Sequence, residues 1–144
     1  MQIISKSAEN TRNIAKDLIA KELLLNRPIV FLLHGDLGSG KTTFTKGIGD
    51  YFGLYKIISP SFVVNCEYEV LDNDVKKLIH FDFYNLKENE YDLIGLDEAL
   101  ERGNVVVIEW PENNKKLMEK ISKIAKIIEI KFEHLTENER TITI

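Results

Sequence analysis

The chain has 144 residues, of which 44% are hydrophobic and 29% are charged, and its formal net charge is −4. This composition supports a folded core, and no repeat, low-complexity tract or linker divides it, so we expect one domain over residues 1–144. The negative net charge argues against a domain that binds the phosphates of nucleic acid, because such a domain needs a basic face.

Cellular location is indicated by three features of the sequence. A single cysteine, Cys66, allows no disulfide within the chain and fits a reducing compartment. No basic segment followed by an apolar one opens the sequence, and no uncharged apolar stretch is long enough to cross a membrane. We therefore expect a soluble, cytoplasmic protein with no membrane partner.

Hydrophobic patterning predicts alternating strands and helices. In chain order it predicts a strand at 1–4, a helix from 7 to about 24, a strand at 29–33, a helix at 43–52, strands at 62–71 and 75–83, a helix at 93–100, a strand at 105–108, a helix at 115–121 and a closing pair of strands at 124–132 and 140–144. The bare apolar runs at 29–33 and 105–108 are typical of buried parallel strands. Together these elements predict an α/β fold with a central, mostly parallel sheet, flanked by helices and antiparallel edge strands.

One short segment carries the strongest functional signal. The motif G-x-x-x-x-G-K-[ST] is matched without a gap by Gly35, Asp36, Leu37, Gly38, Ser39, Gly40, Lys41 and Thr42. A predicted buried strand precedes it and a predicted helix begins at Thr43, which is the context that the motif requires. A glycine-rich turn without chemical meaning is the competing interpretation, and these flanks disfavour it.

The physical chemistry of this segment indicates its ligand. Glycine-rich backbone can turn successive N–H groups inward, and the following helix adds free N–H groups and the positive end of its dipole. Lys41 is expected to reach the β- and γ-phosphates, and the Thr42 hydroxyl to bind a bridging Mg2+. The guanine-specifying pattern Asn-Lys-x-Asp is not matched, because the segment Asn114-Lys115-Lys116-Leu117 ends in leucine where aspartate is required. We therefore favour ATP over GTP.

Two carboxylates follow apolar strand residues. Glu109 ends the run at 105–108 and is expected to hold magnesium or its waters, although acidic residues often end strands without such a role. Asp82 has apolar neighbours on both sides, so it is either paired in a structural network or directed at a metal or water, and we favour the second. Lys41, Asp82 and Glu109 are therefore the candidate catalytic residues.

Arginine is scarce, and this bears on the reaction. The chain has four arginines: Arg12, Arg27, Arg102 and Arg140. None lies in a glycine-flanked lid after the phosphate loop, where small-molecule kinases carry arginines that stabilise the transferring group. We therefore expect slow hydrolysis unless a partner completes the site. The rigid pair Trp110-Pro111 either caps the core or shapes the nucleotide site, and the sequence favours neither role.

Six motifs occur in an order and spacing that cover nearly the whole chain. They are the loop from Gly35 to Thr43, Ser59-Pro60-Ser61-Phe62, Glu67-Tyr68, His80-Phe81-Asp82-Phe83-Tyr84, Gly95-Leu96-Asp97-Glu98 and Ile108-Glu109-Trp110-Pro111. This combination resembles the TsaE family, also called YjeE, the small P-loop ATPases of bacterial tRNA threonylcarbamoyladenosine synthesis. Two departures from the family are Ser61, where threonine is usual, and Asn85, where arginine is usual.

The resemblance implies a P-loop NTPase fold and a magnesium-dependent ATPase that docks on the TsaB–TsaD heterodimer. There it would support the enzyme that installs threonylcarbamoyl on the adenosine beside the anticodon, and it would meet tRNA only indirectly, through the complex. It also implies that Thr42 and Glu109 serve magnesium, that Asp82 helps catalysis, that residues 59–62 form a switch-like segment and that Thr11 lies near the nucleotide.

Two rival functions stay open. A small-molecule kinase would transfer phosphate to a metabolite and should carry lid arginines. A nucleotide-sensing binding module would need no hydrolysis, and the presence of Asp82 and Glu109 argues mildly against it.

Overall fold

The structure, a computed structural model, describes residues 1–23, 26–60, 64–72 and 74–144. Its strands are β1 (Gln2–Ser5), β2 (Ile29–His34), β3 (Asn65–Glu69), β4 (Lys77–Asp82), β5 (Asn104–Glu109), β6 (Lys126–His134) and β7 (Arg140–Thr143). Its helices are α1 (Ala8–Glu22), α2 (Lys41–Tyr51), α3 (Leu96–Ala99) and α4 (Lys115–Ser122), with short 3-10 helices η1 (Glu88–Leu93) and η2 (Pro111–Asn114).

All seven strands form one sheet in the order β1-β7-β6-β2-β5-β4-β3. The four central strands β6, β2, β5 and β4 run parallel to one another. At one edge β3 runs antiparallel to β4, and at the other β7 and β1 add two antiparallel pairings. The predicted α/β class, with a mostly parallel centre and antiparallel edges, is therefore confirmed.

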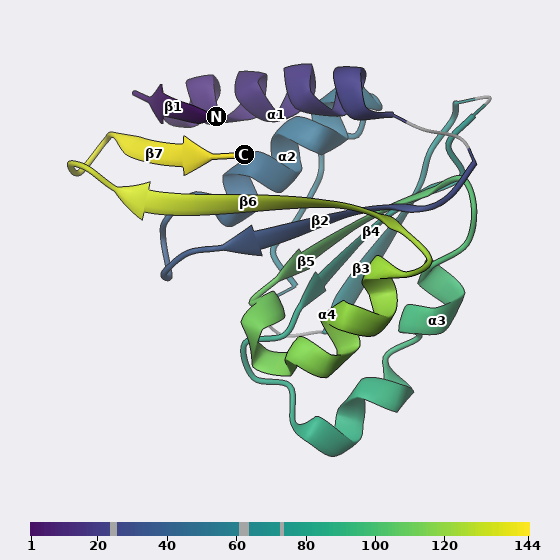
Figure 1. The fold of residues 1–144 in the computed structure, drawn as a ribbon. Helices are drawn as coiled ribbons and strands as arrows, with labels where there is room; N and C mark the ends of the chain where they lie inside the picture. Colours follow the sequence, from purple (N-terminus) through teal and green to yellow (C-terminus); the bar gives the residue numbers. More distant parts are fainter. Residues whose placement is uncertain (24–25, 61–63, 73) are drawn as a thin grey trace.

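Helices cover both faces of the sheet (Figure 1), with α1 and α2 on one side and α3 and α4 on the other. The two faces of β2 explain why its residues 29–33 are all apolar. Phe31 and Leu33 belong to the core beneath α1 and α2, whereas Val30 and Leu32 belong to the opposite core with Ile121 of α4. Successive side chains of a strand point to opposite faces, so a strand buried on both faces has no polar position.

The helix α1 begins where its sequence predicts. Ser7 is the N-cap, and its side chain accepts a hydrogen bond from the Asn10 backbone N–H at 3.0 Å. The Asn10 side chain makes a second hydrogen bond, in which its Oδ1 accepts from the Lys6 backbone N–H at 3.1 Å. The first bond satisfies a backbone donor that the helix start leaves free, and the second fixes the residue before the N-cap. The helix ends at Glu22, and the end predicted at about residue 24 lies outside the described residues.

Other elements differ from their predictions in extent. Of the helix predicted at 93–100, only residues 96–99 form α3, because Gly95 at its N-cap adopts φ 75°, a left-handed conformation, and Leu93 ends the separate 3-10 helix η1. The helix α2 begins at Lys41, two residues earlier than predicted. Of the strand predicted at 62–71, residues 65–69 form β3, while residues 62 and 63 lie outside the described chain. In the described ranges, no helix has both the length and the apolar character that a membrane span requires.

Candidate nucleotide site

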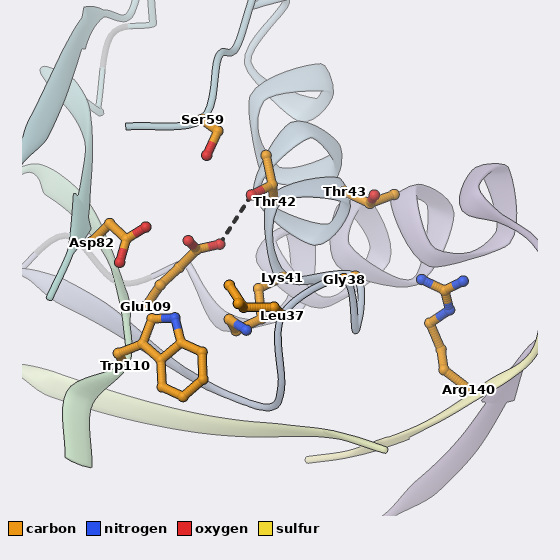
Figure 2. A pocket seen from close by; sticks show the side chains of 11 residues that line it. Leu37, Gly38, Lys41, Thr42, Thr43, Ser59, Asp82, Glu109, Trp110 and Arg140 are labelled. Carbon is orange, nitrogen blue, oxygen red and sulfur yellow. Dashed lines mark hydrogen bonds between the residues drawn. The ribbon is translucent and has the colours of Figure 1, made fainter. Parts of the chain in front are cut away.

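The candidate site lies at one edge of the sheet, where the carboxyl ends of β2, β4 and β5 meet. Glu109 at the end of β5 is in register with Leu33 on β2 and with Asp82 on β4. Ligand sites of open α/β sheets occur at this edge. A cavity of about 280 Å³ opens there, lined by Leu37, Gly38, Gly40, Lys41, Thr42, Thr43, Ser59, Asp82, Glu109, Trp110 and Arg140 (Figure 2).

The loop from Gly35 to Gly40 has the backbone conformation that its glycines permit. Gly38 has φ 74° and Gly40 has φ 111°, both in the left-handed region that other residues rarely adopt. Gly40 caps α2, and a Cβ at this position would lie 2.7 Å from Nη1 of Arg140. The absence of a side chain at Gly40 thus allows Arg140 to approach the start of α2, and the free N–H groups at a helix N-terminus favour anions.

Lys41 is held against its own loop. Its Nζ donates to the carbonyl oxygen of Gly35 and, at 2.9 Å, to that of Asp36, and it lies 4.5 Å from the centre of the Trp110 ring. Burial lowers the pKa of Lys41, while the carboxylates of Glu109 and Asp82 oppose that change. The ammonium group thus occupies the cavity wall with its hydrogen bonds met by neutral carbonyls and an aromatic face.

Thr42 and Glu109 form the polar pair at the back of the cavity. The Thr42 hydroxyl donates to Oε1 of Glu109 at 3.2 Å, and the Glu109 side chain is only 4% exposed. Among the described residues no group of three His, Cys, Asp or Glu side chains could enclose a metal. A hydroxyl and one carboxylate instead fit Mg2+, which keeps several waters and takes its other ligands from phosphate oxygens. The donors present therefore suit magnesium and not a closed protein cage.

Asp82 faces the same cavity from the end of β4. Its Oδ1 accepts a hydrogen bond from the Tyr84 backbone N–H at 2.9 Å. Burial raises the pKa of Asp82, and the nearby charge of Glu109 adds to that rise, while the Tyr84 hydrogen bond opposes it. A partly desolvated carboxylate beside a second carboxylate is an arrangement found at proton-transfer and metal sites.

Trp110 closes one side of the cavity. It is the one non-glycine residue with positive φ, 58°, in the described chain, and this conformation directs its ring over Lys41. The centroids of the Trp110 and Tyr84 rings are 4.9 Å apart, and the Trp110 side chain packs partly against the core beneath α4. Both roles considered from the sequence are therefore present, since the ring lines the cavity and caps the core.

The other predicted site residues lie in different places. Ser39 belongs to the loop, and its carbonyl oxygen accepts from Arg140. Thr11 does not line the cavity: it is fully buried, 2.7 Å from Oγ of Ser5 in hydroxyl-to-hydroxyl contact, and it donates to the Ser7 carbonyl. Its contact with nucleotide stays a prediction. In the segment 59–62, Ser59 lines the cavity and residues 61 and 62 lie outside the described chain.

Sequence reasoning missed Arg140. It stands at the start of β7, lines the cavity, and donates from Nη1 to the Ser39 carbonyl at 3.3 Å. Arg140 therefore contacts the phosphate loop from a distant part of the chain, although it does not lie in a glycine-flanked lid after that loop. No motif marks it, because a hundred residues separate it from the loop and only the pairing of β7 with β6, beside β2, brings it there.

Comparison with known proteins decides the family. A sequence profile described as "Threonylcarbamoyl adenosine biosynthesis protein TsaE" matches residues 5–142. The chain belongs to the TsaE family. It is 38% identical to the TsaE protein of Rickettsia felis, over 99% of this chain and 78% of the relative. It is 31% identical to that of Aquifex aeolicus, over 99% and 94%, and 43% identical to that of Bacillus subtilis, over 56% and 49%.

A solved structure agrees with the sequence comparison. The crystal structure of Bacillus subtilis YdiB matches with a TM-score of 0.66 and 29% identity, covering 99% of this chain and 82% of YdiB. The chain therefore has the P-loop NTPase fold of a TsaE protein. The relatives are named as tRNA threonylcarbamoyladenosine biosynthesis proteins, so this TsaE chain belongs to a family that serves that modification.

Proposed function

We propose that this TsaE chain is a magnesium-dependent ATPase, weakly active alone, that acts with TsaB–TsaD in the threonylcarbamoyl modification of the tRNA adenosine next to the anticodon. One observation carries the proposal: Lys41, the Thr42–Glu109 pair and Asp82 converge on one cavity at the mouth of the phosphate loop. Family membership supplies the pathway.

The residues of the loop would bind the triphosphate. The free N–H groups at the start of α2 and the positive end of its dipole favour phosphate oxygens. Lys41 would exchange its bonds to the Gly35 and Asp36 carbonyls for bonds to the β- and γ-phosphates, which are charged and therefore stronger acceptors. Thr42 and Glu109 would hold the magnesium ion, which neutralises charge on those phosphates when bound.

Asp82 would act on the attacking water. Its carboxylate stands beside that of Glu109 at the same edge of the sheet and faces the cavity (Figure 2). Because burial raises its pKa, Asp82 is a better proton acceptor than an exposed aspartate. In this role it would orient the water and accept its proton as the water oxygen bonds to the γ-phosphorus and the bond from that phosphorus to the β–γ bridging oxygen breaks, releasing ADP.

We expect weak ATP hydrolysis without partners because few of the described cationic side chains lie where the γ-phosphate would bind. Lys41 is the cation on the side of Glu109 and Asp82, whereas Arg140 lies on the other side of the loop, beyond Gly38 (Figure 2). Among the described residues that line the cavity, no second cation approaches the two carboxylates. Transition states of phosphoryl transfer gain several orders of magnitude in rate from such a cation. A partner that supplies one would therefore accelerate hydrolysis.

The test is the affinity of TsaB–TsaD for this chain in different nucleotide states. We expect tighter docking with a non-hydrolysable ATP analogue and magnesium than with ADP or no nucleotide, because a nucleotide shifts an assembly only by binding its states differently. Surface-immobilised TsaB–TsaD would give the dissociation constants. Lys41→Ala should lose the dependence on nucleotide, while Lys46→Ala, exposed on the same helix, should keep it. Equal affinity in all three states would refute the proposed cycle.

The rival functions predict other results. A small-molecule kinase would show transfer of phosphate to a metabolite in a substrate screen. A nucleotide-sensing module would still support tRNA modification as Glu109→Ala, provided that this variant binds ATP.

A further inference from the structure

A buried histidine adjoins the two carboxylates of the site. His80 lies on β4 two residues before Asp82, hence on the same face of the sheet, and it is in register with Val107 on β5. Its side chain is fully buried. Neither ring nitrogen has a hydrogen-bond partner among the described residues. The roles proposed for Lys41, Thr42, Asp82 and Glu109 do not use it.

Packing alone gives no reason for a polar ring at this position. A buried polar group without a partner costs about 1–3 kcal/mol, so an apolar side chain would stabilise the fold better. The neighbouring buried positions of β4, Leu78, Ile79 and Phe81, are all apolar. A polar ring at this buried position is therefore stabilised only if a polar group of a neighbouring residue lies near its nitrogen atoms.

That neighbour is Glu109. Nε2 of His80 lies 3.7 Å from Oε1 of Glu109, and both side chains are almost completely buried. The same Oε1 accepts the hydrogen bond from the Thr42 hydroxyl. An ionised carboxylate can only accept, so the pair is attractive when Nε2 carries the ring proton. A shift of a few tenths of an ångström would bring the two atoms into hydrogen-bond range.

We propose that His80 is a positioning residue for the magnesium site. Its Nε2–H and the Thr42 hydroxyl hold Oε1 of Glu109 from two sides, which leaves Oε2 directed to the ion or its waters. The inference rests on the proposed magnesium-dependent function. Groups that orient metal ligands in this way typically contribute about 10–100-fold to metal affinity or activity.

The matched variants are His80→Met and His80→Gln, which have similar length and volume but differ in whether they retain an N–H donor. The readout is nucleotide affinity, measured by calorimetry across a magnesium series, and not hydrolysis. In His80→Met we expect the magnesium concentration that half-saturates the gain in affinity to rise about 10–100-fold, with magnesium-free affinity unchanged. His80→Gln should recover most of that loss. Leu78→Ala, buried on the same strand, should be less stable but keep the wild-type magnesium response.

Wild-type magnesium dependence in His80→Met would overturn the inference, and so would an equal loss in His80→Gln and His80→Met. If His80→Met does not fold, nitrogen NMR of the wild-type ring decides: a proton on Nε2 whose signal shifts in Glu109→Gln supports the contact, and a proton on Nδ1 alone refutes it. A wild-type chain that binds nucleotide without any response to magnesium would instead refute the proposed magnesium site itself.

Discussion

At the scale of single residues, Asp82 combines a function with a cost to the fold. Burial raises its pKa, so folding disfavours its ionised form relative to the unfolded chain. Asp82→Asn keeps an oxygen for the Tyr84 N–H but removes the charge. We therefore predict that this variant melts at a higher temperature than the wild type at pH 7, while its ATP hydrolysis falls.

The pH dependence of that difference follows from the same shift. As pH falls through the raised pKa of folded Asp82, the wild-type carboxyl gains its proton in the folded state first, and the penalty shrinks. Below about pH 4, the usual range for aspartate, both states are protonated and the two melting temperatures should converge. Thermal unfolding of both proteins from about pH 3 to pH 8 measures this. An Asn variant that is less stable than the wild type at pH 7 would contradict the sign.

Arg140 should bind the part of the nucleotide that ATP and ADP share. In the proposed function the Thr42–Glu109 pair lies at the end of the cavity that would hold the β- and γ-phosphates, and Arg140 lies on the opposite side of the loop (Figure 2). We predict that Arg140→Ala weakens binding of an ATP analogue and of ADP by the same factor, roughly 10-fold, as expected for a lost charged hydrogen bond. Calorimetry with both nucleotides gives the comparison, with the exposed Arg27→Ala as the control. A loss confined to the triphosphate would place Arg140 at the γ-phosphate instead.

At the scale of elements, the phosphate-loop helix depends on a close approach to α1. Gly47 of α2 packs against the backbone of Arg12, and a Cβ there would lie 2.7 Å from Cβ of Ala15. We predict that Gly47→Ala lowers the free energy of unfolding by about 1–3 kcal/mol, the usual cost of overpacking. Urea denaturation measures it. Lys46→Ala, exposed on the same helix, should stay near the wild-type value, and equal stability of all three proteins would show that the helices can separate without cost.

The elements also show how far the sequence could predict the structure. The apolar runs at 29–33 and 105–108 were correctly predicted as the buried strands β2 and β5, because burial on two faces leaves no polar position. The phosphate loop lies between β2 and α2, as its motif requires. The start of α3 was predicted three residues too early, because an isolated glycine such as Gly95 is often tolerated in a helical pattern.

Distant contacts were beyond prediction for a different reason. Arg140 reaches the loop, and His80 reaches Glu109, through the order and register of strands. Local spacing does not encode that order, so a motif search finds the loop residues but not these neighbours. The carboxylates were found because each directly follows apolar strand residues.

At the scale of the whole molecule, the site is open and its γ-phosphate end has one cation. The cavity lies at an edge of the sheet, with Leu37 exposed at its rim. In the proposed function this arrangement would bind phosphates by itself but would leave the transition state partly unstabilised. A docked partner could both exclude water from the cavity and supply the missing interaction, which is why the proposed activity belongs to an assembly.

The most direct measurement is magnesium-dependent ATP hydrolysis by this chain, alone and with TsaB–TsaD, with Glu109→Ala as the control. We predict that the chain alone releases phosphate slowly and that the heterodimer stimulates release at least about 10-fold, because a partner can supply a cation. Glu109→Ala should lose both activities. Equal and rapid hydrolysis with and without TsaB–TsaD would show that the chain holds a complete active site, and it would contradict the account.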